Sequence, residues 1–375
     1  MKKLISLLLA GVLTLGFAGC GGSGSGSGSN TETPASGTPA AKAQETTAGS
    51  NVVKVYNWGE YIGEDVIQNF EKEYDAKVIY EYFDSNEMMY TKLLAGDSYD
   101  VLVPSDYMIE RLIKEDRLQP IDLEKIPNFE NLVDSLKGLD YDPDNTYSVP
   151  YFWGNVGLVY NKNNVPKEEI EAKGYEILRD EKYKGKIYIY DSERDAFMTA
   201  FKALGYSMNT ENEDEINAAY EWLCDVNAKM EPAYVTDEVI DSMANGNKDI
   251  AVVYSGDAAY ILQENEDMGF CMPNEGTNLW SDAMVIPKNA ENPELAHKFI
   301  NYILTYEASE DNSLTVGYAS TNKDVLADLS SEGGEFYGNE AYLPREGYEK
   351  DEIFHDNEVL KKRLSELWIK VKAGS

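Results

Sequence analysis

The 375-residue sequence contains little histidine and few basic residues. It has only two histidines, His297 and His355, which leaves little room for histidine-based catalysis or a multi-histidine metal site. Lys and Arg number 33 against 67 Asp and Glu, which gives a formal net charge of −34. No basic patch interrupts this acidic excess. Because nucleic-acid binding depends on basic groups that contact phosphates, the composition argues against it.

Cysteine and several familiar motifs are also scarce. Of the three cysteines, Cys20 belongs to an N-terminal segment described below, which leaves Cys224 and Cys271. We predict that these two are reduced and structural, because each lies among core-type residues and a buried thiol behaves as a small hydrophobic group. The sequence contains no P-loop, no GxGxxG after a predicted strand, no CxxC and no internal repeat.

The N-terminus has the pattern of an export signal. Lys2 and Lys3 precede an apolar run over 4–15, which is too short to span a bilayer. Small residues then lead to Cys20, and this ending resembles that of a bacterial lipoprotein signal. The resemblance implies a signal peptide over 1–19 and lipidation, including palmitate, at Cys20. A plain secretory signal with an incidental cysteine is the alternative.

Residues 20–51 form a predicted flexible linker. Gly and Ser repeats are followed by Thr, Ala, Pro and Glu, with almost nothing to bury. A lipid anchor with such a linker would hold a folded domain at the outer face of the bacterial cytoplasmic membrane. In a cell with an outer membrane, that location is the periplasm.

Beyond residue 51 the hydrophobic pattern alternates between strands and helices. Strands are expected at 52–58, 76–82 and 99–104, with helices at 64–74 and 87–95 between them. This order predicts an α/β fold with parallel strands. A strand expected at 156–160 leaves this first region. A second α/β region then follows, with strands at 186–190 and 250–254 and a helix at 216–228, and further helices are expected at 293–306 and 359–372.

Aromatic and acidic residues recur where these strands end, which is where α/β sheets bind ligands. The residues concerned are Trp58, Glu60, Tyr61, Ser105, Asp106 and Tyr107 in the first region, and Asp191, Ser192, Asp195, Tyr254 and Asp257 in the second. Any one of these groups could equally be explained by helix capping, since acids are favoured at helix starts.

Trp280 and Asp282 form a further pair. They lie two apart in a stretch that reads as extended chain stopped by Pro287, so both side chains are expected on one face. An indole beside a carboxylate can receive an organic cation through cation–π contact and N–H hydrogen bonds. The alternative is a core tryptophan with Asp282 as a helix or turn cap.

Several segments taken together resemble the spermidine/putrescine-binding proteins of bacterial ABC transporters. They are VYNWGEY (55–61), YDVLVPSDY (99–107), YSVPYFWGNVG (147–157), WSDAMVIP (280–287), GYASTN (317–322) and the acidic cluster at 191–195. The resemblance implies a two-lobed, type II periplasmic-binding-protein-like α/β fold with two crossover strands and a ligand cleft between the lobes. Lobe 1 would comprise 52–157 and 283–322, and lobe 2 would comprise 158–282 and 323–375.

The same resemblance implies roles for individual residues. The aromatic positions that would hold the aliphatic chain are Trp58, Tyr61, Tyr107, Trp280 and Tyr318, with Tyr254 standing where relatives have Trp. Glu60, Asp195 and Asp282 match acids that receive amines, and Ser105 matches a polar contact. Ser192 falls where an acid is expected, next to Asp191, and His355 falls where an amide is often found.

The implied protein is a monomeric solute-binding component, without enzymatic activity or cofactor, that delivers spermidine or putrescine to ABC permease subunits. Two other functions are compatible with the sequence. A ferric-iron or other solute-binding protein of the same fold would draw on the 27 tyrosines, and a glycoside hydrolase would use paired acids such as Asp195 and Asp282.

Overall fold

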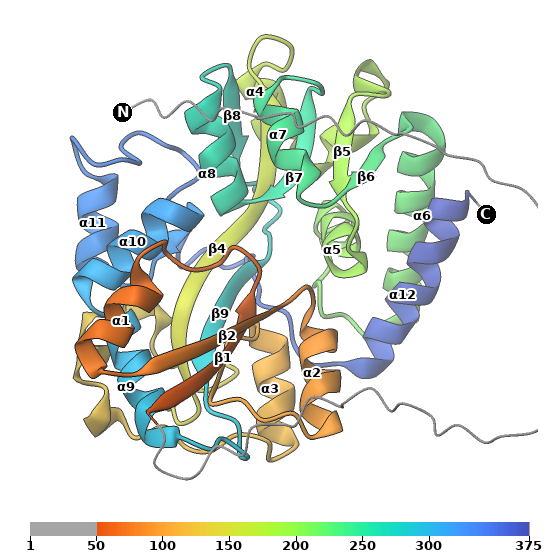
Figure 1. Cartoon of the computed structure of the whole chain (residues 1–375). Coiled ribbons are helices and arrows are strands. Elements are labelled where there is room, and N and C mark those ends of the chain that lie inside the picture. The colour runs from red at the N-terminus through yellow and green to blue at the C-terminus, as the bar shows by residue number, and fades with distance from the viewer. Residues whose placement is uncertain (1–50, 375) are drawn as a thin grey trace, which may run out of the picture. The chain divides into compact units, whose positions relative to one another are not determined.

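The computed structural model describes residues 51–374 (Figure 1). The predicted signal peptide (1–19), Cys20 and nearly all of the predicted linker (20–51) lie outside the described residues. Within the described chain, no helix combines the length and apolar character needed to cross a membrane.

The first part of the sheet is parallel, as predicted. β1 (Val52–Trp58) pairs in parallel with both β2 (Lys77–Phe83) and β3 (Val101–Leu102). The connecting helices and the helix after β3 are α1 (Val66–Tyr74), α2 (Asn86–Ala95) and α3 (Asp106–Lys114). Because the three strands point the same way, their carboxyl ends lie at one edge of the sheet.

Two long strands connect this part to the second. β4 (Ser148–Asn161) runs antiparallel to β9 (Leu279–Val285) along its first half and antiparallel to β7 (Ile250–Tyr254) along its second half (Figure 1). β4 begins eight residues before the strand predicted at 156–160. Pro150 argues against a regular strand, and the register of the β4–β9 ladder shifts between Pro150 and Phe152. This irregularity accommodates the proline within the sheet.

The second part of the sheet is again parallel. β5 (Ile187–Tyr190) pairs in parallel with β6 (Ala233–Val235) and with β7, while β8 (Met268–Cys271) pairs antiparallel with β4. The helices of this part are α4 (Lys167–Lys173), α5 (Glu193–Ala203), α6 (Glu213–Met230), α7 (Glu238–Ala244) and α8 (Ser255–Glu264). In the described chain the strand order is β2-β1-β3-β9-β4-β7-β5-β6, with β8 and β10 (Ala319–Ser320) added on β4.

The C-terminal helices differ from the prediction at one point. The helix predicted over 293–306 is two helices, α9 (Pro293–Ile303) and α10 (Tyr306–Val316). Thr305 separates them because its hydroxyl accepts the backbone N–H of Ala308 and so caps α10. The other helices here are α11 (Lys323–Ser330) and α12 (Glu358–Ala373). Short 3₁₀ turns occupy Leu123–Lys125, Pro127–Asn131, Asp134–Leu136, Gly174–Arg179 and Glu181–Tyr183.

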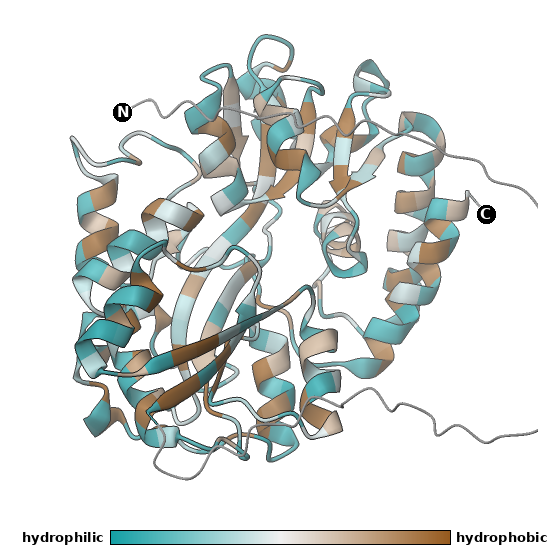
Figure 2. Cartoon of the chain, viewed as in Figure 1, coloured by the Kyte–Doolittle hydropathy of each residue, from teal (hydrophilic) through white to brown (hydrophobic). Residues whose placement is uncertain are grey.

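Hydrophobic residues concentrate on the strands and on the helix faces that cover them (Figure 2). β4 is buried from Ser148 to Tyr160, because other elements cover both faces of the sheet there. Cys224 is half-buried in α6 and Cys271 is buried in β8, and both thiols are free, as predicted. β4 and β9 are therefore buried strands in the middle of the sheet, and they connect its two parts.

A buried carboxylate shapes the turn that leads into β4. Asp142 Oδ1 accepts the N–H of Thr146 at 3.0 Å, and its Oδ2 accepts the N–H of Tyr147 at 2.9 Å. The same Oδ2 accepts the N–H of Ser148 at 2.8 Å and its hydroxyl at 2.7 Å. One side chain thus satisfies three consecutive backbone donors at the start of the longest strand described.

We expect Asp142→Ala to lower the free energy of unfolding by about 2–4 kcal/mol, because it leaves these donors without a partner. Urea denaturation would measure the change. The matched control is Asp144→Ala in the same turn, since Asp144 is exposed and its loss should cost less than about 0.5 kcal/mol. Equal effects of the two substitutions would contradict this account of the turn.

Candidate functional site

Three tyrosine hydroxyls donate to three carboxylates near the junction of the two parts of the sheet. Tyr61 Oη lies 2.9 Å from Asp282 Oδ2, and Tyr254 Oη lies 2.8 Å from Asp195 Oδ2. Tyr318 Oη lies 3.1 Å from Asp257 Oδ1. We call these residues, with Trp280, the tyrosine–carboxylate cluster.

Ring contacts join the three pairs into one cluster. Trp280 packs edge-on against Tyr318, with ring centroids 5.0 Å apart, and against Tyr254 at 6.1 Å. Tyr318 in turn contacts Tyr61 at 5.8 Å. Trp280 and Asp282 therefore face the same cluster, which confirms the prediction that they share one face of an extended strand. Asp282 lies inside β9 rather than at a helix start, so the alternative of a helix cap is wrong.

The fold brings these residues together from strand ends in both parts of the sheet. Tyr61 follows β1, Asp195 lies in the first turn of α5 after β5, and Tyr254 ends β7 with Asp257 just beyond it. β9 contributes Trp280 and Asp282. The carboxyl ends of two sets of parallel strands thus converge beside β9, as expected for a ligand site in an α/β sheet.

Two glycines make the close packing possible. A Cβ atom on Gly256 would lie 2.2 Å from Tyr318 Cδ1, so the tyrosine ring rests directly on the backbone at the start of α8. A Cβ atom on Gly154 would lie 2.4 Å from Ser255 Oγ and 2.7 Å from Trp280 Cζ2. Any side chain at either position would displace an aromatic wall of the cluster.

Burial makes the carboxylates of the cluster reluctant to ionise. It raises the pKa of Asp282 to about 6, an effect that the hydroxyls of Ser105 and Tyr61 partly offset. Burial likewise raises the pKa of Asp257 to about 7, although the Tyr318 hydroxyl opposes this. The pKa of Asp195 is also raised by burial. A cation placed among these groups would reverse the shifts, because an opposite charge favours the ionised carboxylate.

Two polar atoms of the cluster are buried without a hydrogen-bond partner among the described residues. They are Oδ1 of Asp195 and Nε1 of Trp280. Asp195 is only 4% exposed, so water does not readily satisfy this oxygen. Leaving a buried acceptor unpaired is costly, and a donor brought by a ligand would remove that cost.

A fourth buried acid, Asp106, adjoins the cluster. Its Oδ1 accepts the backbone N–H of Tyr107 at 2.7 Å and its Oδ2 accepts that of Ser281 at 3.4 Å. Burial, with a smaller contribution from the nearby Asp282, raises the pKa of Asp106 to about 8, although the backbone N–H groups of Tyr107 and Ser281 oppose this. Asp106, which the sequence predicted as a site residue, therefore adjoins the cluster and accepts hydrogen bonds from the backbone of both α3 and β9.

Comparison with known proteins identifies the family. The family model "Bacterial extracellular solute-binding protein" matches residues 65–335. The chain is 34% identical over 303 residues, 80% of this chain and 84% of the relative, to the spermidine/putrescine-binding periplasmic protein of Escherichia coli K12. This chain belongs to the bacterial extracellular solute-binding proteins.

Solved structures agree with this assignment. The spermidine/putrescine ABC transporter substrate-binding protein PotD of Streptococcus pneumoniae has a TM-score of 0.75 and 33% identity, over 87% of this chain and 99% of that chain. The Tp0655 (TpPotD) lipoprotein of Treponema pallidum has a TM-score of 0.74 and 27% identity, over 86% of this chain and 99% of that chain. The solute-binding protein therefore has the predicted type II α/β fold, and the resemblance drawn from its motifs is confirmed.

The remaining predicted residues of the first region lie around the cluster. Ser105 borders Asp282 through an isolated β-bridge. Tyr107 and Trp58 are half-buried, and the Trp58 ring packs on Phe83 with centroids 4.6 Å apart. Unlike Asp106 and Asp282, Glu60 is exposed, in the turn after β1, where its φ is 50°.

Three further predicted residues do not belong to the tyrosine–carboxylate cluster. Asp191 is exposed and accepts hydrogen bonds from Trp368 Nε1 at 3.0 Å and Lys372 Nζ at 2.6 Å, both on α12. Ser192 caps α5 by accepting the backbone N–H of Asp195, so the capping alternative describes it well. His355 is exposed, and its Nδ1 lies 3.3 Å from Glu110 Oε2.

Sequence reasoning missed Asn86, a buried residue that positions two of the predicted ones. Its Nδ2 donates to Ser105 Oγ at 3.1 Å and to Tyr107 Oη at 2.9 Å. Its Oδ1 accepts the backbone N–H of Ser105 at 3.1 Å. Nothing in the local pattern distinguishes this asparagine from an ordinary first-turn helix residue, because its partners lie about twenty residues away.

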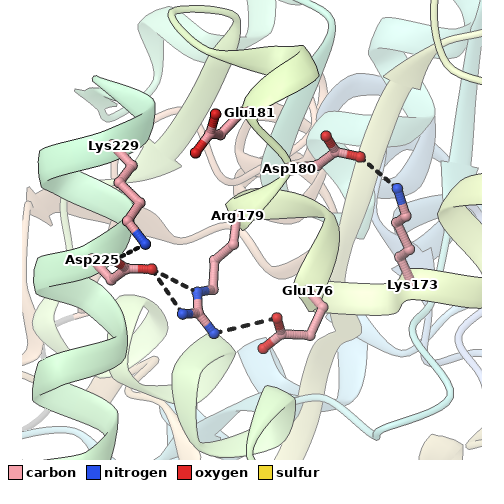
Figure 3. Close-up of a pocket in the computed structure, with 7 residues that line it drawn as sticks. All are labelled: Lys173, Glu176, Arg179, Asp180, Glu181, Asp225 and Lys229. Atoms are coloured by element: carbon pink, nitrogen blue, oxygen red, sulfur yellow. Dashed lines mark hydrogen bonds and ion pairs between the residues drawn. The ribbon is translucent and has the colours of Figure 1, made fainter.

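A hollow on the surface lies apart from the cluster residues and is lined by charged residues (Figure 3). They are Lys173, Glu176, Arg179, Asp180, Glu181, Asp225 and Lys229. Most of these side chains neutralise each other, as in the pairs Arg179–Asp225 at 2.7 Å and Lys229–Asp225 at 2.6 Å. Unlike the cluster, this hollow offers no aromatic wall. Among residues 51–374, the cluster and this hollow included, no three His, Cys, Asp or Glu side chains are grouped so as to hold a metal ion.

The buried acids give the protein a characteristic pH dependence. The pKa of Asp106 rises from about 3.9 in the unfolded chain to about 8 in the folded protein. The folded protein therefore binds the Asp106 proton more tightly than the unfolded chain does. The stability that this proton contributes is fully present below about pH 4 and is lost as the pH rises toward 8. We expect the free energy of unfolding of Asp106→Asn, relative to that of the parent, to increase by roughly 1 kcal/mol or more between about pH 5 and pH 9.

Urea denaturation across this pH range would measure the difference between the two proteins. Asp134→Asn is the matched control, because the Asp134 side chain is 90% exposed and its effect should not change over the range. A constant difference for Asp106→Asn would contradict the raised pKa.

Proposed function

We propose that the protein is the substrate-binding component of a polyamine import system and binds spermidine or putrescine at the tyrosine–carboxylate cluster. The observation that carries the proposal is the buried Oδ1 of Asp195, which has no partner among the described residues. It lies in a cluster with the buried carboxylate of Asp282, the half-buried carboxylate of Asp257 and four aromatic rings. The relatives described above, which are named as spermidine/putrescine-binding proteins, point to the same ligands.

The chemistry of a polyamine fits this arrangement. Such a ligand consists of methylene chains that separate ammonium groups, so it needs apolar walls alternating with carboxylates. Trp280, Tyr254 and Tyr318 offer aromatic faces and edges, and each cation–π contact contributes roughly 0.5–2 kcal/mol. Asp195, Asp257 and Asp282 supply acceptors for the ammonium groups, and charge-assisted hydrogen bonds of this kind are the stronger ones.

Buried and half-buried acids at the proposed site come from both proposed lobes. In the proposed division into 52–157 with 283–322 and 158–282 with 323–375, Asp106 and Tyr61 stand in lobe 1, whereas Asp195, Asp257 and Asp282 stand in lobe 2. The charge of Asp282 raises the pKa of Asp106, so the two carboxylates interact across this division. Without a cation these carboxylates repel each other, which favours separation of the lobes until a polycation bridges them. The hinges would lie in β4 near 155–160 and in β9 near 282–284.

The same proposal includes the partners and the cellular location of the protein. The family implies delivery of the ligand to ABC permease subunits by a monomeric protein that performs no catalysis. Cleavage before Cys20 and lipidation of its thiol would tether the domain outside the cytoplasmic membrane through residues 20–51. One structural relative is itself described as a lipoprotein, which supports this anchoring.

Calorimetric titration of the protein with putrescine, spermidine, spermine and agmatine tests the proposal directly. Saturable binding of at least one polyamine supports it. Absence of binding, together with visible absorption on adding ferric iron or turnover of a glycoside, would favour the iron-binding or hydrolase alternative.

We expect Asp282→Asn to weaken polyamine binding roughly tenfold to a hundredfold, since a hydrogen bond to a charged group contributes about 1.5–3 kcal/mol. The amide keeps the shape of the side chain and an acceptor for Tyr61, so the fold should persist. Titration calorimetry measures the affinity and thermal unfolding checks the fold. Trp280→Leu should also weaken binding, because it removes the aromatic wall.

The matched control for these substitutions is Asp134→Asn, which removes one negative charge from an exposed position. Its affinity should equal that of the parent. If Asp282→Asn bound putrescine and spermidine as tightly as the parent does, Asp282 would not belong to the site.

Affinity should also rise with pH. An ammonium group binds the ionised carboxylates, whereas burial raises the pKa of Asp282 to about 6 and that of Asp257 to about 7 in the empty protein. Protons must therefore leave when ligand binds below about pH 7, and binding should strengthen from about pH 5 to pH 8 and then level off. Calorimetry in buffers of different ionisation enthalpy would detect the released protons, and a pH-independent affinity would contradict the expectation.

A further inference from the structure

The guanidinium of Arg194 is held by an aromatic ring and a carboxylate, which are the kinds of group that the proposed ligand site offers to a cation. It lies in the first turn of α5, beside Asp195, and its side chain is only 16% exposed. Its Cζ lies 3.7 Å from the ring centroid of Tyr107, and its Nη1 lies 3.3 Å from Glu87 Oε1. An aromatic face and a carboxylate therefore enclose a cation that belongs to the chain itself.

The partners of Arg194 are fixed to the proposed site. Asn86 donates to the Tyr107 hydroxyl and also to Ser105 Oγ, and Ser105 borders Asp282. Asn86 therefore positions both the Tyr107 ring, which lies under the guanidinium, and Ser105, which is the neighbour of Asp282. Glu87, next to Asn86 in α2, also pairs with Lys361 of α12.

The charge of Arg194 acts on the acids of the site. It lowers the pKa of both Asp106 and Asp195, against the larger effect of burial. One end of the proposed site, next to Tyr107, therefore already contains a positive charge.

Resting on the proposed function, we infer that Arg194 limits the length of the bound polyamine by occupying the face of Tyr107 and the carboxylate of Glu87. A diamine that spans the tyrosine–carboxylate cluster leaves this arrangement intact. A longer polyamine whose additional ammonium group extends toward Tyr107 meets a guanidinium already seated there, and must displace it against like-charge repulsion. The residue thus selects for short polyamines over long ones.

Replacement of Arg194 tests the inference. Arg194→Met keeps an unbranched apolar side chain over Tyr107 but removes the charge, and Arg194→Gln is a second variant with a polar end. We expect the affinity for spermine and spermidine, relative to putrescine, to increase about tenfold in either variant. Titration calorimetry with all three polyamines gives the ratios, and thermal unfolding confirms that the variants are folded.

Lys361→Met is the matched control. It removes the other cation on Glu87 without touching Tyr107, so the ratio of affinities should change by less than about threefold. An equal gain for putrescine, spermidine and spermine in Arg194→Met, or an unchanged ratio, would overturn the inference. Parent protein that binds no polyamine would instead overturn the proposed function, so the two failures are distinguishable.

Discussion

The hydrogen bond from a tyrosine hydroxyl to a carboxylate, with both groups buried or half-buried, is the interaction on which the site depends. It occurs three times, between Tyr61 and Asp282, Tyr254 and Asp195, and Tyr318 and Asp257. Each bond gives the acid one donor, which is too little to offset the loss of water around an ionised carboxylate. The raised pKa values of the three acids express this deficit. The cluster is therefore stable as part of the fold and also remains receptive to an additional cation.

The sheet supplies the geometry for this arrangement. β4 and β9 run side by side through the junction, and parallel strands on each side direct their carboxyl ends toward it. An acid at the end of a single strand can remain in contact with water. Acids at the ends of two opposed sets of strands instead lie close together and shield one another from water. Gly154 and Gly256 allow the rings of Trp280 and Tyr318 to lie against the backbone, which closes the cluster from the remaining side. The concentration of negative charge is thus a consequence of topology.

Arg194 shows how the same chemistry can be used within the chain. Its guanidinium stacks on Tyr107 and pairs with Glu87, as a ligand amine would do with an aromatic ring and an acid. In the proposed function the tyrosine–carboxylate cluster would receive a cation from the ligand, whereas Tyr107 and Glu87 already receive one from the chain itself. This difference offers a physical basis for discrimination among ligands that share one repeating chemistry and vary only in length.

The sequence by itself determined the alternation of strands and helices, the export signal pattern and the strand ends at which aromatic and acidic residues gather. These features are local, because periodicity of two or 3.6 residues and the residues after a strand can be read within a short window. It also placed Trp280 and Asp282 on one face. The tertiary structure alone decided which acids enter the cluster. Asp191 and Asp195 both follow β5, yet Trp368 and Lys372 of α12 engage Asp191, while Tyr254 engages Asp195. Likewise, only the packing of α2 against α3 gives Asn86 its role. These outcomes depend on partners from about 20 to 180 residues away, and contacts at such separations are set by how the whole core packs rather than by any local pattern.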